Sequence, residues 1–190
     1  PQGILTVLEQ PVYDLTQLLE QPDPLFLILE NLQDPGNLGT MIRTGEGAGI
    51  TGVIMNNQTV DIFNPKTIRA TMGSIFRVPF VYVPDLAPVL EQMHAKGIYT
   101  YAAHLKGQEY YDSFSFREPT AFLIGNEGNG LSKEISDQAG QYLKIPMEGR
   151  VESLNASIAA ALLMYEAHRQ RSARPVSYTH LRAHETDSYL

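Results

Sequence analysis

Polar residues that could bind or activate a ligand fall in three stretches of the sequence. They are 31–43, with Asn37 and Arg43; 125–132, with Glu127; and 145–166, with Ser153 and Asn155. In the third stretch, a β-rich run is followed by a polar loop and then by an apolar run with helical spacing. A loop that enters a helix leaves backbone amides free beside the positive end of the helix dipole. The third stretch therefore predicts a small-ligand site at its loop.

The helix that follows this loop has a predicted buried face. Ser153 or Asn155 can cap the helix, since short polar side chains accept hydrogen bonds from its first N–H groups. Five residues at helical spacing should pack on the core: Leu154, Ile158, Ala161, Leu162 and Tyr165. Asn155 can equally be a cap alone, and Ser157 a small packing residue.

The glycine-rich stretch 125–132 follows a predicted strand and precedes a predicted helix. Open α/β sheets bind ligands at this position, beyond the carboxyl ends of their strands. The spacing is not G-x-G-x-x-G, and no G-x-x-x-x-G-K-S/T occurs, so a dinucleotide or triphosphate site is not indicated. Glu127 in such a turn can fix a helix or a cationic partner, although a purely structural role is as common.

The stretch 31–43 predicts a helix that Asn37 caps and that ends at Gly49. Arg43 lies two turns into this helix, where an arginine is usually solvated or paired with an acid. Taken alone, it indicates no chemistry.

Strand and helix signals alternate along the chain. Strands are predicted at 25–29, 52–55, 76–83 with a break at Pro79, 98–102, 121–125 and 142–145, and helices at 37–49, 64–69, 85–96, from 132 and from 154. This alternation predicts an α/β domain with a mostly parallel sheet and helices on both faces.

Composition excludes several classes of protein. The chain has 190 residues, 43% of them hydrophobic, and no cysteine, which predicts one globular domain without disulfides or thiolate metal sites. No apolar run approaches the roughly 20 residues of a membrane span, and no signal-peptide pattern is present, so we expect a cytoplasmic protein. The net charge of −7 argues against nonspecific binding to nucleic acid. A local basic patch would need Arg43, Lys66, Arg69, Arg77 and Lys144.

The stretch 174–190 lacks the periodicity of the preceding helix and is expected to be an appended tail outside the fold. Its His180 and His184 are four residues apart, a spacing that can bind zinc on a helix. No third ligand lies nearby, and we expect no metal. The predicted domain is 25–173, preceded by a linker or N-terminal extension at 1–24.

The three polar stretches together resemble one known family. The patterns are Asn-x-x-Asp-Pro-x-Asn-x-Gly-x-x-x-Arg from Asn31, Ile-Gly-Asn-Glu-Gly-x-Gly-Leu from Ile124, and Ile-Pro-Met-x-Gly-x-x-x-Ser-Leu-Asn-x-Ser-x-Ala from Ile145. In this order and at these intervals they closely resemble the SpoU (TrmH) family of RNA ribose 2′-O-methyltransferases. The resemblance covers roughly 25–171, with Ala156 where valine is common in the family.

The resemblance implies a fold, a cofactor and a set of site residues. Family members have a deep trefoil knot near the C-terminus and bind S-adenosylmethionine between two loops. By position, Gly125, Ile145, Met147 and Leu154 should contact this cofactor. Arg43, Asn37, Glu127, Ser153 and Asn155 should surround the reacting hydroxyl. Since a guanidinium is a poor base, we expect Arg43 to bind phosphate and to stabilise negative charge on oxygen.

The resemblance also implies partners. The substrate would be RNA, ribosomal more than transfer RNA. A homodimer would place the helix of the first stretch and the last helix at its interface, with Arg43 near the partner's site. Family members often carry an N-terminal RNA-binding domain, which we expect to be missing before Pro1. Two alternatives are a domain of this fold that binds RNA or cofactor without catalysis, and a nicotinamide-dependent oxidoreductase, for which the glycine fingerprint is missing.

Overall fold

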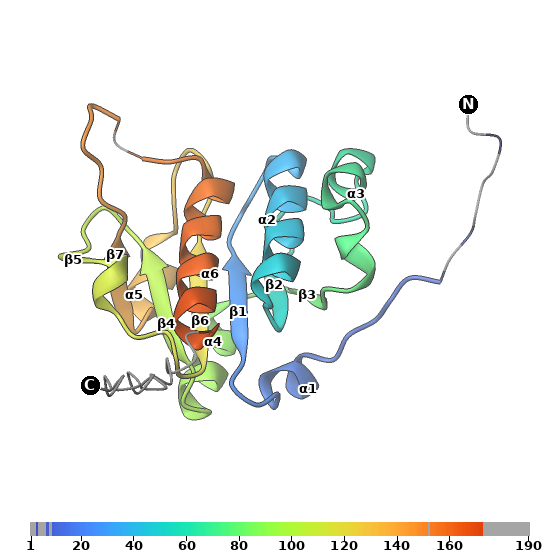
Figure 1. The fold of residues 1–190 in the computed structure, drawn as a ribbon. Helices are drawn as coiled ribbons and strands as arrows, with labels where there is room; N and C mark the ends of the chain where they lie inside the picture. The colour runs from blue at the N-terminus through green and yellow to red at the C-terminus, as the bar shows by residue number, and fades with distance from the viewer. Residues whose placement is uncertain (1–2, 4–6, 8, 152, 173–190) are drawn as a thin grey trace, which may run out of the picture.

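A single parallel sheet organises the chain in the computed structural model, which describes residues 3, 7, 9–151 and 153–172 (Figure 1). Its seven strands lie in the order β3-β2-β1-β6-β4-β7-β5. They are β1 Leu25–Leu29, β2 Gly52–Asn56, β3 Phe80–Val83, β4 Tyr99–Ala103, β5 Glu109–Tyr110, β6 Thr120–Ile124 and β7 Gln141–Lys144. Each pairing between these strands is parallel. The order reverses between β1 and β6, and ligands bind at such switch points in open α/β sheets.

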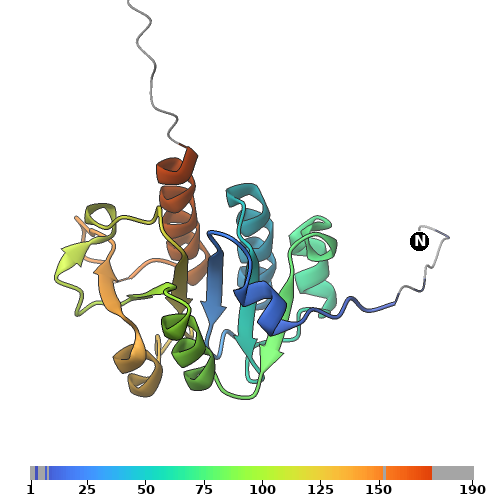
Figure 2. The ribbon, with the colours of Figure 1, turned by 90° about the horizontal axis from the view of Figure 1, so that it is seen from below.

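Helices cover both faces of the sheet, as predicted (Figures 1 and 2). They are α1 Leu15–Leu19, α2 Pro35–Ala48, α3 Pro65–Thr71, α4 Ala87–Ala95, α5 Lys133–Gln138 and α6 Ala156–Ser172. Side chains alternate along β1: Leu27 packs in a core with α2 and α6, and Phe26 packs in a second core with α1, α4 and α5. All five residues of β1 are buried, and so are those of β2 and β6. Their continuous apolar sequences follow from this double coverage.

Two predicted element boundaries are wrong. Asp34, not Asn37, caps α2: its carboxylate accepts a hydrogen bond of 2.8 Å from the Asn37 N–H. Asn37 therefore lies inside the first turn and its side chain is free for other contacts. Of the strand predicted at 76–83 with a break at Pro79, only the part after the break forms: β3 begins at Phe80, because Ser74–Phe76 form a 3₁₀ turn and Pro79 has no N–H to donate.

The predicted buried face of α6 is also wrong. The residues that face the core are Ser157, Ala160, Leu163, Met164 and Ala167. Ile158, Leu162 and Tyr165 remain 50%, 37% and 49% exposed. This helix carries apolar residues on nearly every side, so spacing alone did not select a face. This face is buried because α6 packs on α2, where a Cβ at Gly45 would be in ordinary contact, at 3.6 Å, with the Met164 sulfur.

The C-terminal end of α6 is fixed to the chain before β1 and β6. Arg171 donates hydrogen bonds to the carbonyl oxygens of Phe116, at 2.7 Å, Asp23, at 2.8 Å, and Glu118, at 2.7 Å. A longer bond of 3.3 Å reaches the Pro24 carbonyl. These carbonyls lie at the amino ends of the two central strands, so Arg171 ties the last helix to that edge of the sheet.

No helix in the described part of the chain is both long and apolar enough to cross a membrane. The predicted tail at 174–190, with His180 and His184, lies outside the described residues.

Candidate active site

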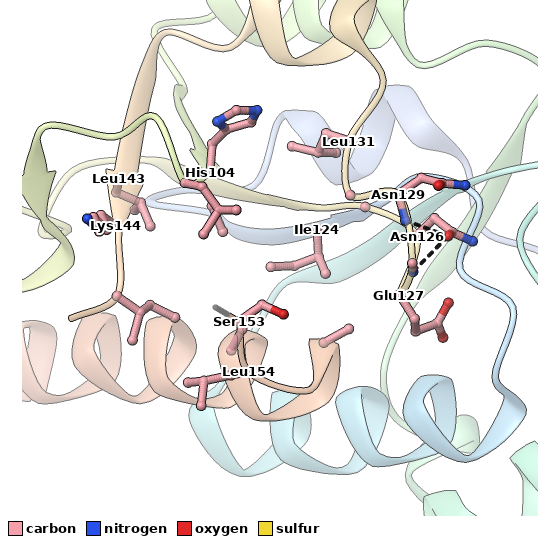
Figure 3. A pocket seen from close by; sticks show the side chains of 18 of the residues that line it. His104, Ile124, Asn126, Glu127, Asn129, Leu131, Leu143, Lys144, Ser153 and Leu154 are labelled. Carbon is pink, nitrogen blue, oxygen red and sulfur yellow. Dashed lines mark hydrogen bonds between the residues drawn. The ribbon is translucent and has the colours of Figure 1, made fainter. Parts of the chain in front are cut away.

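A cavity of about 290 Å³ opens at the carboxyl ends of β4, β6 and β7 (Figure 3). Three segments form it: the end of β4 with the residues after it, the glycine-rich loop after β6, and the loop between β7 and α6. The residues that line the cavity include His104, Gly125, Glu127, Leu131, Leu143, Lys144, Ile145, Met147, Ser153 and Leu154. Figure 3 shows Ile124, Leu131, Leu143 and Leu154 around the hollow and Glu127 on one side of it. The cavity therefore has apolar walls with polar groups at its rim, as small-molecule sites usually do.

The loop after β6 is closed so tightly that position 125 accepts only glycine. A Cβ at Gly125 would lie 2.1 Å from the backbone carbon of Gly130 and 2.1 Å from the Leu131 nitrogen. Two backbone hydrogen bonds, of 3.0 and 2.8 Å, join Asn126 to Gly130, and the Asn126 side chain accepts from the Gly128 N–H at 2.9 Å. The loop thus has a closely fixed backbone at the edge of the cavity, which its Glu127 and Leu131 also line.

Glu127 joins this loop to the start of α2. Its carboxylate accepts hydrogen bonds from the N–H groups of Gln33, at 3.0 Å, and Asp34, at 2.9 Å, and from the Asn37 amide at 3.1 Å. Burial would raise the pKa of Glu127, but these hydrogen bonds outweigh burial and hold the pKa below its usual value. The carboxylate is consequently charged at neutral pH. These contacts also fit the prediction that Glu127 can fix a helix.

Asn37 extends the connection to the third stretch. Its side-chain oxygen accepts a hydrogen bond of 3.0 Å from the Asn155 amide. The Asn155 oxygen in turn accepts from the Ser157 N–H at 2.9 Å and the Ser157 hydroxyl at 2.7 Å, and so caps α6. Glu127, Asn37 and Asn155 therefore form one hydrogen-bonded chain across the three polar stretches of the sequence.

The other predicted site residues divide into two groups. Gly125, Ile145, Met147, Leu154 and Ser153 all line the cavity. Arg43, in contrast, does not line it; it lies exposed on α2, and six positions along a helix place it on a different side from Asn37. The structure brings together every predicted residue except Arg43.

Four residues with a part in the site were not predicted. Glu30 is buried and accepts a hydrogen bond of 2.7 Å from the Ser132 N–H, which holds the far end of the glycine-rich loop. Asn126 donates to the Asn31 carbonyl at 2.9 Å. His104 lines the cavity, beside the ring of Tyr142. Glu30, Asn31, Asn126 and His104 directly follow strands, so the rule that parallel strands end at one edge would have identified them.

The basic residues proposed for a local patch are spread over two places. Lys144 lines the cavity. Lys66 forms an ion pair of 3.2 Å with Asp34, the residue whose N–H is bonded to Glu127. Arg77 pairs with Glu46 on the outer side of α2. In the described residues, no three acidic or histidine side chains come together as a metal site would require.

The sequence and fold match known proteins. The model of the SpoU rRNA Methylase family matches residues 24–165. The 23S rRNA (guanosine(2553)-2′-O)-methyltransferase RlmP of Bacillus subtilis is 36% identical over 165 residues, which are 87% of this chain and 64% of the relative.

Solved structures give the same result. The SpoU methyltransferase AviRb from Streptomyces viridochromogenes, in complex with the cofactor AdoMet, superposes with a TM-score of 0.81 and 34% identity, over 88% of this chain and 65% of that one. An AdoMet-bound rRNA methyltransferase from Sinorhizobium meliloti has a TM-score of 0.79 and 37% identity, over 85% and 62%. This chain spans a little under two thirds of the length of these relatives. It belongs to the SpoU methylase family.

Proposed function

We propose that this protein transfers a methyl group from S-adenosylmethionine to a ribose 2′-hydroxyl of RNA. One observation carries the proposal: Glu127, Asn37 and Asn155 are linked by hydrogen bonds beside a cavity whose walls hold all four predicted cofactor contacts. Relatives of similar sequence and fold are described as RNA methyltransferases or as AdoMet complexes, which supports the same reaction.

The residues of the cavity fit the proposed cofactor. Leu131, Leu143 and Leu154 offer apolar surface for an adenine ring, and the glycine at 125 lets backbone groups approach closely. S-adenosylmethionine, when bound, supplies the activated methyl group, so the protein has mainly to position the acceptor oxygen. Glu127 fixes the glycine-rich loop against the start of α2, and Asn37 links Glu127 to Asn155 at the start of α6; this preorganisation is its proposed contribution.

The acceptor is proposed to lie beside Asn37, Ser153 and Asn155, with Arg43 on its phosphate. A guanidinium keeps its proton at neutral pH, so Arg43 stabilises developing negative charge and does not act as the base. Since Arg43 lies away from the cavity of its own chain, it is proposed to serve the cavity of a second copy.

A homodimer is therefore part of the proposal. The exposed apolar face of α6, with Ile158, Leu162 and Tyr165, is the surface proposed to pack on the partner, together with α2. A helix face that stays in water normally carries polar side chains, whereas this face of α6 carries large apolar ones. An active monomer in light scattering would contradict this arrangement.

The finer parts of the proposal concern fold and substrate. Residues 25–173 are proposed as the methyltransferase domain, with 1–24 as its N-terminal extension. The chain after β7 threads a preceding loop to form a trefoil knot. Stretching the protein between residues 15 and 172 tests the knot, since a knotted chain extends less than an open one.

Ribosomal RNA is the proposed substrate, ahead of transfer RNA, because RlmP is named for 23S rRNA.

Methyl transfer to purified RNA tests the function directly. Ribosomal and transfer RNA from cells that lack the protein would be incubated with it and with tritiated-methyl S-adenosylmethionine. Ribose methylation protects the adjacent phosphodiester from alkali, so alkaline mapping would locate the label. Arg43→Ala should lower transfer by at least about 100-fold, while cofactor affinity is unchanged. Cofactor binding with no transfer to either RNA would favour a binding domain instead.

A further inference from the structure

Large apolar side chains are exposed on α3 and on the turn that follows it. Ile68 is 38% exposed, Met72 69% and Phe76 57%. Ile68 and Met72 are four positions apart and therefore share one face of the helix. Apolar side chains that gather on a surface mark a binding site more often than single exposed ones do.

The backbone holds these side chains at the surface. Met72 ends α3 in the left-handed conformation, with φ of 51°, and Gly73 follows with φ of 89°. The left-handed conformation is uncommon for a residue other than glycine, asparagine or aspartate. The turn leads into the 3₁₀ segment, where Ser74 and Ile75 are buried while Phe76 is exposed. Phe76 is thus exposed directly after two residues that are anchored in the core.

The charge of this region is opposite to that of the whole chain. Residues 34–80 contain four basic side chains, Arg43, Lys66, Arg69 and Arg77, and three acidic ones, Asp34, Glu46 and Asp61. Their net charge is +1, against −7 for the chain, so the remaining residues carry −8. Lys66 and Arg69 lie on α3 itself, beside the exposed apolar side chains. Basic side chains interleaved with aromatic and apolar ones favour a polyanion with flat bases as the occupant.

This surface begins at the rim of the active site. Lys66 in the first turn of α3 contacts Asp34, and the Asp34 N–H is bonded to Glu127. From there α3 runs alongside α2 (Figure 1). A nucleic-acid strand that leaves the cavity on this side would therefore meet Lys66 first, and then Arg69, Met72 and Phe76.

We propose that Lys66, Ile68, Arg69, Met72 and Phe76, here called the α3 platform, bind single-stranded RNA next to the methylated nucleotide. The phosphates pair with Lys66 and Arg69, and an unpaired base stacks on Phe76 and Met72. Contacts of this kind depend little on base identity. The α3 platform rests on the proposed function, and it adds a requirement for an unpaired segment beside the target.

Binding of a labelled, roughly 20-nucleotide RNA of CA repeats tests the platform, with fluorescence anisotropy read at several KCl concentrations. Loss of one stacked base by Phe76→Ala should weaken binding about tenfold or more. Arg69→Gln should reduce the slope of log affinity against log salt by about 0.7, the value for one phosphate contact on a single strand. A perfect duplex of the same length should bind the unaltered protein more weakly, because its bases are not free to stack.

Tyr99→Ala is the matched control. Tyr99 is 55% exposed at the start of β4, the opposite edge of the sheet from the cavity, and its loss should change neither affinity nor salt slope. Calorimetry with S-adenosylmethionine should give the same affinity for all three variants, so a failure of the cofactor site is seen separately from a failure of the platform.

Three results would overturn the proposal. In the first, the unaltered protein does not bind the RNA of CA repeats. In the second, Phe76→Ala and Arg69→Gln bind it as tightly as the unaltered protein does. In the third, Phe76→Ala changes the oligomeric state in sedimentation and leaves RNA affinity alone. The surface would then be a contact between protein chains.

Discussion

At each end of strands β1 and β6, one charged side chain binds backbone groups of distant segments, but the consequences differ between the two ends. At the carboxyl ends, Glu127 accepts hydrogen bonds from backbone N–H groups of Gln33 and Asp34. At the amino ends, Arg171 donates to the carbonyls of Asp23, Phe116 and Glu118. Each side chain binds backbone groups that are far from it in the sequence. Only Glu127, however, borders a cavity.

The difference lies in what surrounds each anchor. Arg171 is half-buried, and burial lowers the pKa of its guanidinium, which ordinarily titrates far above neutral pH. Its partners are strand-entry carbonyls that need donors, so it completes the fold. Glu127 is exposed and joins the glycine-rich loop after β6 to the polar segment before α2. The other polar groups of these two segments remain available to bind a ligand. We therefore expect changes at the carboxyl edge to affect binding and chemistry, and changes at the amino edge to affect stability alone.

Gly125→Ala should have the largest effect. Its Cβ would fall 2.1 Å from backbone atoms of the same loop, and backbone cannot move aside without opening the loop. We expect a loss of about 3 kcal/mol or more in stability, or of more than about 100-fold in cofactor affinity, measured by thermal unfolding and calorimetry. Gly128→Ala is the control, because its nearest new contact is an ordinary 3.5 Å. Equal behaviour of the two variants would refute the tight-loop geometry.

Arg171→Met should lower the free energy of unfolding by about 2 to 3 kcal/mol. The change leaves the carbonyls of Phe116 and Glu118, the first of them in a part-buried bond, without this donor, while it keeps much of the apolar stem. Urea unfolding measures the loss, and Arg169→Met, which removes an exposed pair with Glu166, should cost less than about 1 kcal/mol. The cofactor affinity of Arg171→Met should be unchanged. A drop in that affinity would mean that the two ends of the sheet are not independent.

Glu127→Gln should cost about 1 to 2 kcal/mol of stability and, in contrast to Arg171→Met, should also weaken the site. A neutral amide retains one acceptor oxygen, but its NH₂ group faces one of the N–H donors that the carboxylate now satisfies. We expect methyl transfer to fall more than cofactor affinity, since the Asn37 side chain loses its fixed position. Separate measurement of kcat and cofactor affinity would show this.

The acid dependence of stability should show the smallest effect. The pKa of Glu127 is lowered in the folded protein, so its contribution is complete above its ordinary value near 4.5 and is lost as pH falls through the lower, folded value. Glu127→Gln should therefore differ most from the unaltered protein above about pH 4.5, and the difference should shrink in more acid solution. The exposure of the side chain keeps this effect small. A difference that grows with falling pH would contradict the assigned hydrogen bonds.

The sequence predicted the carboxyl edge better than the helix surfaces. Buried parallel strands such as β1 have continuous apolar sequences, and the polar residues that follow them gather at one edge by geometry alone. The wrong face of α6 shows the limit of this reasoning. Its burial depends on packing against α2, which spacing within α6 cannot reveal.

Two other features depended on contacts across the chain. Asn37 has the side chain of a good cap, but Asp34 takes that role, and only the structure shows Asn37 turned towards Glu127 and Asn155. Arg171 lies in the polar C-terminal end of α6, and no pattern in the neighbouring sequence indicates its structural role. Its partners are carbonyls more than 50 residues away.

Backbone amide spectra titrated with S-adenosylmethionine test the central claim most directly, namely that the two loops at the carboxyl edge bind the cofactor. Shifts should concentrate in residues 125–131 and 145–154, and the amides of 114–118, near Arg171, should not move. Shifts centred on the amino edge, or none at all in a folded protein, would contradict the account.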